Sequence, residues 1–254
     1  LGKRDGDGTE GIIARATQMI PDVIDRAKEL RKAGNPINKL YVFGLGDLVE
    51  GCGDHYPMQN FSVEIDQRRQ EMVARRLIIK ALMAWAPHFD KIVVAAVPGN
   101  HGENRKNGKA YTTFGDNIDV AVFDQAQEAL SMNKVFDHIS FVIPDNELWL
   151  TLDIDGVILG LAHGHQFRTG GRYSHQKAVN WLSGQAFGKT DIGDVDILLS
   201  GHFHHLFVIN EGQRTLMQAP SVDGGSEWFE NLTGKNSFAG VLTFTVKSKE
   251  NKLP

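Results

Sequence analysis

Apolar residues repeat with two different spacings along this chain. In the segment 10–34 they recur every three or four positions, at Ile13, Ala16, Ile20, Ile24, Ala27 and Leu30. This spacing predicts an amphipathic helix that ends near Gly34, with Pro21 expected to kink or divide it. The same spacing predicts a second helix over 62–86. We expect two further helices at 116–131 and at about 174–187.

Short apolar runs lie between these helical segments. They predict strands at 39–47, 91–101, 157–165 and 196–205, followed by two later strands in "TLMQAP" (215–220) and "FAGVLTFTV" (238–246). Continuous apolar strands that alternate with helices are typical of a buried sheet in an α/β protein. No linker divides the chain, so we expect a single α/β domain over residues 1–254.

Composition narrows the choice of partner and compartment. The net charge of −4 gives no global attraction to nucleic acid or membranes, so any attraction to phosphate must be local. No apolar run approaches the roughly 20 residues of a membrane helix, and we expect no membrane partner. Cys52 is the one cysteine, which excludes an internal disulfide and favours a reducing, cytoplasmic location.

Four of the predicted strands end in small residues followed by residues of the types that bind metal ions in proteins. These ends are Gly46-Asp47, Gly99-Asn100-His101, His163-Gly164-His165 and Gly201-His202-Phe203-His204. Ligand sites in α/β sheets lie at the carboxyl ends of strands, and glycine allows the sharp turns such sites need. Carboxylate, amide and imidazole donors suit Mn²⁺, Fe or Zn²⁺ better than Ca²⁺ or a thiolate-bound structural zinc.

Each of these short motifs, taken alone, is also compatible with an ordinary turn or surface loop. Four of them in this order at strand ends indicate one common site instead. We therefore interpret His202 and His204 as ligands. His165 and His205 are expected to contact the ligands without binding the ion, or to be exposed at the surface.

The ordered set "GD", "GNH", "HGH" and "GHFH" resembles the calcineurin-like metallophosphoesterase superfamily from the first residues to about residue 246. The resemblance implies a layered sheet sandwich flanked by helices, with ligands at strand ends, and two divalent ions, Mn²⁺ above all, with Fe, Zn²⁺ or Mg²⁺ as alternatives. It implies that Asp47 bridges both metals, that Asn100, His163 and His202 bind the second, and that His204 binds the first. His101 is then no ligand: it contacts the phosphate and protonates the leaving oxygen.

The family's opening Asp-x-His motif is absent from this sequence. We expect the chain to start immediately after that motif and to lack the first strand, which leaves the first metal with Asp47 and His204. A rival interpretation has Asp5 and Asp7 replace the motif. A calcium loop there is excluded because Ala16 stands where a bidentate glutamate is needed.

Two basic loops follow metal-type loops directly. The first, "ENRKNGK", contains Arg105, and the second, "FRTGGRYSHQK", contains Arg168, Arg172, His175 and Lys177. They are either solvated loops or a positive rim that binds a phosphodiester and steers it to the metals. Tyr111, Tyr173 and Trp181 could stack on bases or pack internally. Glu103 is the acid nearest to His101 in the motif and could hold its tautomer.

The flanking residues distinguish branches of the family. "GDLVEGCG" and "PGNHGE" lack the arginines typical of protein phosphatases, whereas "VPGNH" and the basic loops resemble the bacterial and phage DNA-repair exonucleases. This favours a Mn²⁺-dependent DNA nuclease, with an ATPase partner or a homo-oligomer possible as in that branch. The alternatives are a small phosphodiesterase acting on linear or cyclic nucleotides and, in a different class, a non-catalytic metal-binding scaffold. Retention of His101 disfavours the scaffold.

Overall fold

The computed structural model describes residues 8–53, 55–168, 171–225 and 238–247, so Asp5 and Asp7 lie outside the described residues. The helices are α1 (Thr9–Lys32), α2 (Gln59–Ser62), α3 (Gln67–Trp85), α4 (Ile118–Ser131) and α5 (Ser174–Gly188). The strands are β1 (Lys39–Gly44), β2 (Lys91–Ala96), β3 (Arg105–Lys106), β4 (Lys109–Ala110), β5 (Ile139–Val142), β6 (Trp149–Ile154), β7 (Val157–Ala162), β8 (Ile197–Ser200), β9 (Phe207–Glu211) and β10 (Arg214–Gln218). Three short 3₁₀ turns cover Ala86–His88, Lys134–Phe136 and Asp191–Asp194.

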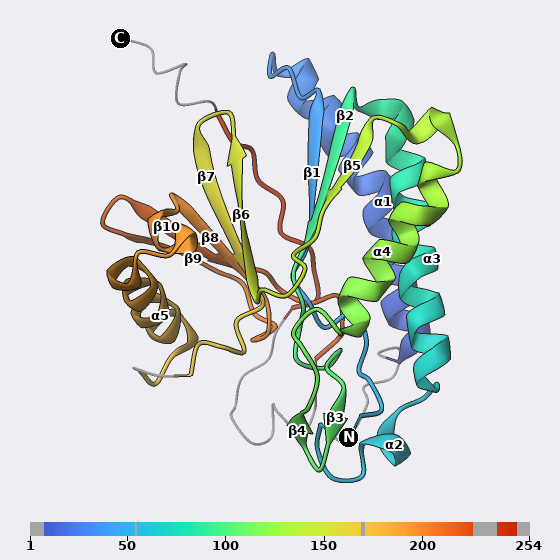
Figure 1. Cartoon of the computed structure of the whole chain (residues 1–254). Helices are drawn as coiled ribbons and strands as arrows, with labels where there is room; N and C mark the ends of the chain where they lie inside the picture. Colours follow the sequence, from blue (N-terminus) through green and yellow to red (C-terminus); the bar gives the residue numbers. More distant parts are fainter. Residues whose placement is uncertain (1–7, 54, 169–170, 226–237, 248–254) are drawn as a thin grey trace.

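Two sheets face each other with helices outside them, which confirms the predicted α/β class (Figure 1). One sheet has the order β1-β2-β5 and is parallel; the other has the order β6-β7-β8-β10-β9 and is mixed. Helices α1, α3 and α4 cover the outer face of the first sheet, and α5 covers the second (Figure 1). Each sheet thereby buries one face against the other sheet and the opposite face against helices.

The core between the two sheets is aliphatic. Leu159 and Leu161 on β7 are fully buried there, together with Leu199 on β8, Ala95 on β2 and Val97, which directly follows β2. Two further clusters fill the layers beneath the helices, one below α1, α3 and α4 and one below α5. Both faces of each sheet are therefore buried.

The helix predictions hold in kind and differ at the ends. Helix α1 continues through Pro21 undivided, because Ile20 and Ala27 are buried in the cluster it shares with α3. Helix α3 begins at Gln67, five residues later than predicted from 62, since the Asp66 side chain accepts a hydrogen bond from the Arg69 N–H and caps it. No helix in the described part of the chain is long and apolar enough to cross a bilayer.

The strand predicted at 238–246 is wrong. From residue 240 to residue 247, half-buried and exposed positions alternate, and Phe244 and Val246 pack against the core between the sheets. A strand also needs a neighbour for its backbone N–H and C=O groups, and this segment pairs with no strand among the described residues. The segment has the alternation of a strand without the pairing.

Parallel pairing brings the four motif-bearing strands to one end of the molecule. β1 pairs in parallel with β2 in one sheet, and β7 pairs in parallel with β8 in the other. The loops that follow all four strands meet where the two sheets converge (Figure 1). This edge holds the candidate site.

Candidate metal centre

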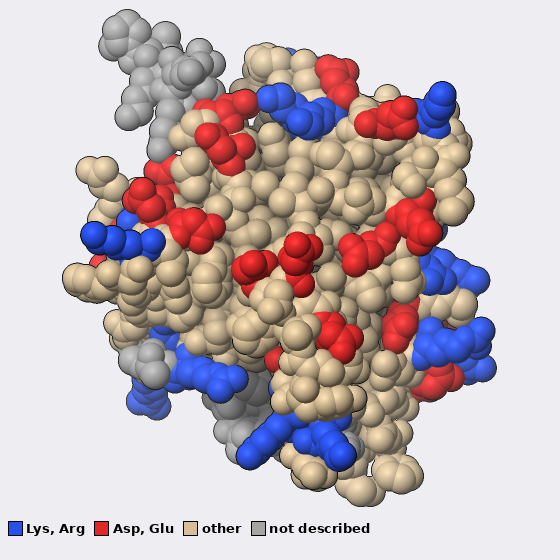
Figure 2. All heavy atoms as spheres, viewed as in Figure 1, with Lys and Arg blue, Asp and Glu red and all other residues tan. Residues whose placement is uncertain are grey.

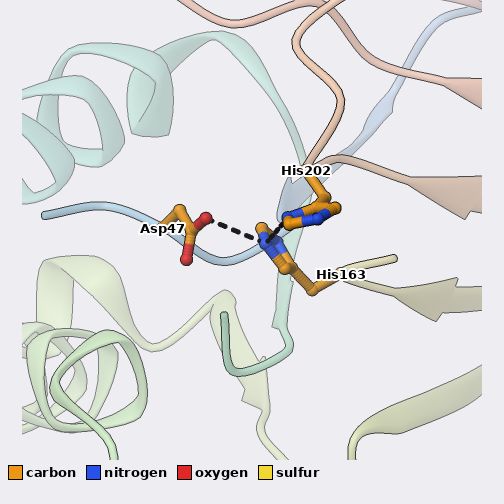
Figure 3. A group of neighbouring side chains, drawn as sticks. All are labelled: Asp47, His163 and His202. Atoms are coloured by element: carbon orange, nitrogen blue, oxygen red, sulfur yellow. Dashed lines mark hydrogen bonds and ion pairs between the residues drawn. The ribbon is translucent and has the colours of Figure 1, made fainter. Parts of the chain in front are cut away.

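Side chains from three different loops meet at this edge (Figure 3). Asp47, His163 and His202 each place a potential ligand atom within 4.8 Å of those of the other two. His163 Nε2 lies 2.9 Å from Asp47 Oδ2 and 3.2 Å from His202 Nδ1. It also lies 3.1 Å from Asn100 Oδ1. Four of the five sequence-predicted ligands therefore come together around one nitrogen.

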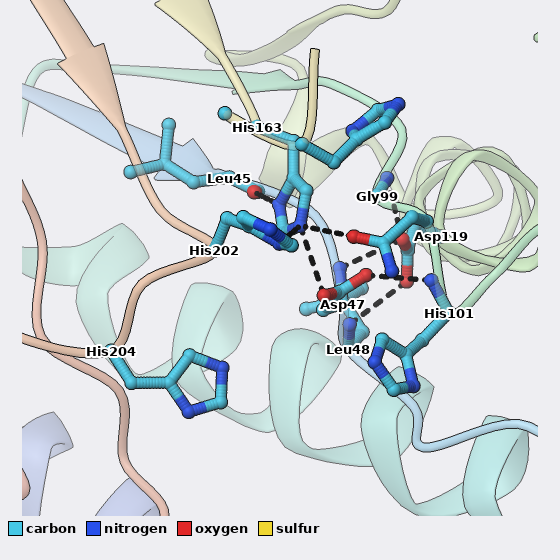
Figure 4. Close-up of polar contacts among 12 residues, drawn as sticks. Leu45, Asp47, Leu48, Gly99, His101, Asp119, His163, His202 and His204 are labelled. Atoms are coloured by element: carbon cyan, nitrogen blue, oxygen red, sulfur yellow. Dashed lines mark hydrogen bonds and ion pairs between the residues drawn. The ribbon is translucent and has the colours of Figure 1, made fainter. Parts of the chain in front are cut away.

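The tautomer of His163 suits metal binding. Its Nδ1 lies 2.5 Å from the Leu45 carbonyl oxygen, which can only accept, so Nδ1 carries the hydrogen (Figure 4). A ligating histidine typically donates one N–H to such an acceptor and binds the ion with the other nitrogen. Nε2 then faces a carboxylate oxygen, an amide oxygen and a second imidazole. A convergence of acceptors in a buried place is the environment that a divalent cation fits.

The backbone is strained at the candidate ligands. Asp47, His202 and His204 have φ of 55°, 66° and 57°, in the left-handed region that non-glycine residues rarely adopt. Such conformations persist where the surrounding structure holds them, and they gather at functional sites. Gly99 serves the same site: a Cβ there would lie 2.2 Å from Asp47 Oδ1, so glycine lets the two loops touch.

Charge and burial set the protonation of the cluster. Burial favours the neutral form of Asp47, but its hydrogen bond and ion pair with His163 outweigh burial and lower the pKa of Asp47. Burial lowers the pKa of His163, but the hydrogen bond and charge of the Asp47 carboxylate raise it by more. The net pKa of His163 is therefore above 6.5. Burial and the neighbouring His163 lower the pKa of His202 to about 4 and that of His165 to about 3. Neutral imidazoles keep a lone pair free for a metal.

His204 stands apart from this cluster (Figure 4). Its Nδ1 forms an ion pair of 2.9 Å with Asp223, and 46% of its side chain is exposed. Burial lowers the pKa of His204, but the hydrogen bond and charge of Asp223 raise it more. Its assignment as a ligand of a first metal stays a prediction.

His101 lies against the cluster without joining it. Its backbone N–H donates to Asp47 Oδ1 at 2.9 Å, and its ring Nδ1 lies 2.9 Å from the Glu50 carbonyl oxygen and 3.7 Å from Glu50 Oε2. Glu50 therefore orients this imidazole. Glu103, the acid suggested by the sequence, instead forms a 2.6 Å ion pair with Arg105.

Sequence reasoning missed His55. Its ring lies 4.1 Å from the ring of His101, and its Nε2 lies 3.1 Å from Asn100 Nδ2. Neutral Nε2 accepts from that amide, which directs Asn100 Oδ1 toward His163. Burial and the charge of His101 lower the pKa of His55 to about 4, which keeps this acceptor available. His55 follows no predicted strand, so position alone gave no signal.

The basic residues form two separate groups near the site. Figure 2 shows Lys and Arg side chains over the β3–β4 hairpin and beside α5. Arg168 and Arg172 are exposed, and Lys177 is half-buried on α5. His175 stacks on Tyr173 with ring centroids 5.6 Å apart, and Trp181 packs on Phe167 at 4.8 Å. The substrate contacts expected of His175, Tyr173 and Trp181 stay predictions. Tyr111, beside the hairpin, is 64% exposed.

No family model and no curated protein matches this sequence. Among solved structures, it is similar to a predicted phosphoesterase from Streptococcus pneumoniae, at 11% identity and a TM-score of 0.32, covering 73% of each chain. It is similar to an archaeal phosphodiesterase at 13% identity and a TM-score of 0.35, covering 87% of this chain and 84% of that one. It is also similar to zinc-bound Vps29 from Entamoeba histolytica at 18% identity and a TM-score of 0.30, covering 53% of this chain and 59% of that one. Likenesses this weak do not decide a function, which has to be inferred from the geometry of the site.

The raised pKa of His163 makes metal affinity depend on pH. Without metal, the protonated His163 paired with Asp47 stabilises the fold below pH 6.5, and this contribution is lost as pH rises through the raised pKa. A metal needs the neutral imidazole and must displace that proton. We expect the affinity for Mn²⁺ to increase from about pH 6 to about pH 8, by up to about tenfold per pH unit below the raised pKa. Calorimetric titration in buffers of different ionisation enthalpy measures both the affinity and the released proton. An affinity that is flat over this range contradicts the role of His163.

Proposed function

We propose that this chain is a metal-dependent phosphodiester hydrolase that acts on DNA. The observation that carries the proposal is the convergence of Asp47, Asn100, His163 and His202, with the imidazole of His101 beside them. Bound divalent ions would activate a water as nucleophile and neutralise charge on the phosphate oxygens. The oxygen and imidazole donors suit Mn²⁺, and also Fe and Zn²⁺.

The protein supplies the geometry of the ion site. Asp47 accepts the His101 backbone N–H with one carboxylate oxygen and keeps the other toward His163, so it can reach more than one ion. His204, held by Asp223, is the candidate for a first ion, as the resemblance implies. Two ions are proposed on this basis.

His101 is proposed to protonate the leaving oxygen. Its Nδ1–H is directed to the Glu50 carbonyl oxygen, which leaves Nε2 to carry the transferred proton. The Glu50 carboxylate lies 3.7 Å from Nδ1 and helps to hold the ring in this orientation. Because the His101 backbone N–H also donates to Asp47, the proposed general acid His101 is held in a fixed position relative to the proposed ion site.

The exposed lysines of the β3–β4 hairpin favour a polyanionic substrate. Lys106 and Lys109 lie directly opposite each other in its register, and both are exposed. Like charges opposite each other destabilise a hairpin unless an anion lies between or beside them. The Asn107-Gly108 turn has φ of 52° and 73°, typical of the tight turn that fixes this pairing. The exposed Tyr111 beside it offers a face for a base.

Replacement of His101 tests the chemistry. We expect His101→Ala to lower turnover on DNA by about 10²–10⁴-fold, because an alkoxide leaves poorly without a proton. Hydrolysis of bis-p-nitrophenyl phosphate should fall much less, since p-nitrophenolate leaves unprotonated. His163→Ala should lose bound metal and both activities. Metal analysis with paired kinetics decides: loss of metal in His101→Ala would make this residue a ligand, and no Mn²⁺-dependent hydrolysis of either substrate by the wild type would refute the function.

Neutralising the hairpin lysines tests the choice of substrate. We expect Lys106→Ala with Lys109→Ala to weaken DNA binding and to reduce the slope of log affinity against log salt by about 2, one for each lost phosphate contact. Hydrolysis of the small diester should be nearly unchanged. The control, Lys80→Ala with Lys134→Ala, removes the same charge from exposed positions on α3 and at Lys134–Phe136. Equal losses on both substrates would favour a small nucleotide phosphodiesterase.

A further inference from the structure

Asp119 is a buried carboxylate beside the candidate ligands. It lies in the first turn of α4 and is 1% exposed. One oxygen, Oδ2, accepts the backbone N–H groups of Asp47 at 2.8 Å and Gly99 at 2.9 Å (Figure 4). The other, Oδ1, accepts the Leu48 N–H at 2.8 Å. A single carboxylate thus binds both the loop after β1 and the loop after β2.

Asn117 strengthens the same connection. Its side-chain oxygen accepts the Asp119 N–H at 2.9 Å and caps α4, while its amide nitrogen donates to the Gly99 carbonyl oxygen at 2.8 Å. The Ile118 N–H donates to the Gly102 carbonyl oxygen. The start of α4 therefore contacts both ends of the loop that carries Asn100 and His101. We call Asn117 and Asp119 the α4 clamp.

The charge of Asp119 has a cost that a neutral residue would avoid. Asp119 makes no ion pair with a described residue, and its neighbour Asp47 is also an acid. Two nearby carboxylates in a buried place repel each other and lose hydration. Hydrogen bonds from three backbone N–H groups offset part of this cost, and a divalent cation next to Asp47 would offset more.

We propose that Asp119 is a positioning residue of the metal centre. It fixes the separation of the Asp47 and Asn100 loops, because its carboxylate holds backbone N–H groups from both of them. We assign it a positioning role because both its oxygens accept backbone N–H groups of the two loops. This inference rests on the proposed metal centre and adds two residues, Asn117 and Asp119, to it.

The glycines around the clamp agree with this role. A Cβ at Gly102 would lie 2.3 Å from Asn117 Oδ1, and one at Gly99 would lie 2.9 Å from Asp119 Oδ2. Both distances are far below van der Waals contact. The clamp thus reaches the two loops only because they carry glycine where it touches them.

The test is Asp119→Asn. Asparagine keeps the shape but has one acceptor oxygen, so its NH₂ must face at least one backbone N–H. We expect the dissociation constant for Mn²⁺ to rise about 10–100-fold, as for other residues that orient ligands. In the metal-free protein, the amides of Asp47, Leu48 and Gly99 should exchange with solvent faster. Electron paramagnetic resonance of Mn²⁺ gives the affinity, and NMR gives the exchange rates. Neither readout needs activity.

The matched control is Asp116→Asn. It removes the same charge three residues earlier from an exposed side chain outside the clamp, and it should leave affinity and exchange unchanged. Asn117→Ser gives a second variant if Asp119→Asn fails to fold: serine retains the cap but is too short to reach the Gly99 carbonyl oxygen. It should weaken Mn²⁺ binding less than Asp119→Asn.

The outcomes separate the two proposals. Wild-type affinity for Mn²⁺ in the folded clamp variants, while the wild type binds the ion, would overturn the role of Asp119 and leave the metal centre standing. Lower thermal stability with unchanged affinity would show a purely structural cap and overturn it equally. A wild-type chain that binds no Mn²⁺ would overturn the metal centre and the clamp together.

Discussion

The Asp47 carboxylate group is the point on which the arrangement of the site depends. Its Oδ1 accepts the His101 N–H, its Oδ2 pairs with His163, and its own backbone N–H is held by Asp119. Loops after β1, β2 and β7 and the start of α4 thereby meet at one residue. Its left-handed backbone, with φ of 55°, is kept in place by these bonds. Moving Asp47 would displace all of its partners at once.

The charges around Asp47 are balanced in an unusual way. Asp47 and Asp119 are both acids, and the protonated His163 is the cation nearest to Asp47 among the described side chains. His55, His165 and His202 are kept neutral by burial and by neighbouring positive charge, with pKa values of about 4, 3 and 4. The result is a group of imidazole lone pairs and carboxylate oxygens in which the acidic proton between His163 and Asp47 is the one that a metal would displace. A divalent cation can replace that proton and compensate both acids, which is why we regard the cluster as built for metal.

The parts of this molecule that depend on local sequence were predictable. Apolar runs at 39–47, 91–101, 157–165 and 196–205 indicated four strands, and the polar residues after them indicated the four loops whose side chains were expected to gather. The contacts that required the folded chain are long-range. Glu50, His55 and Asp119 reach the site through turns and a helix start whose positions depend on tertiary packing. The segment 238–246 has a strand's alternation but pairs with no strand in the described ranges, and α1 passes Pro21 because burial against α3 outweighs a local preference.

The net charge of −4 and the proposed substrate are reconciled by where the cations lie. The charges of Arg105 and Arg168 reach the site closely enough to lower the pKa values of His55 and His165, after burial and nearer imidazoles. Lys106 and Lys109 extend the positive field along an exposed hairpin, while acidic side chains lie across the middle of the visible face and further Lys and Arg side chains lie at its top and right side (Figure 2). Since electrostatic fields fall off within about 10 Å in salt, the proposed phosphodiester would respond to the cations around the site more than to the total charge.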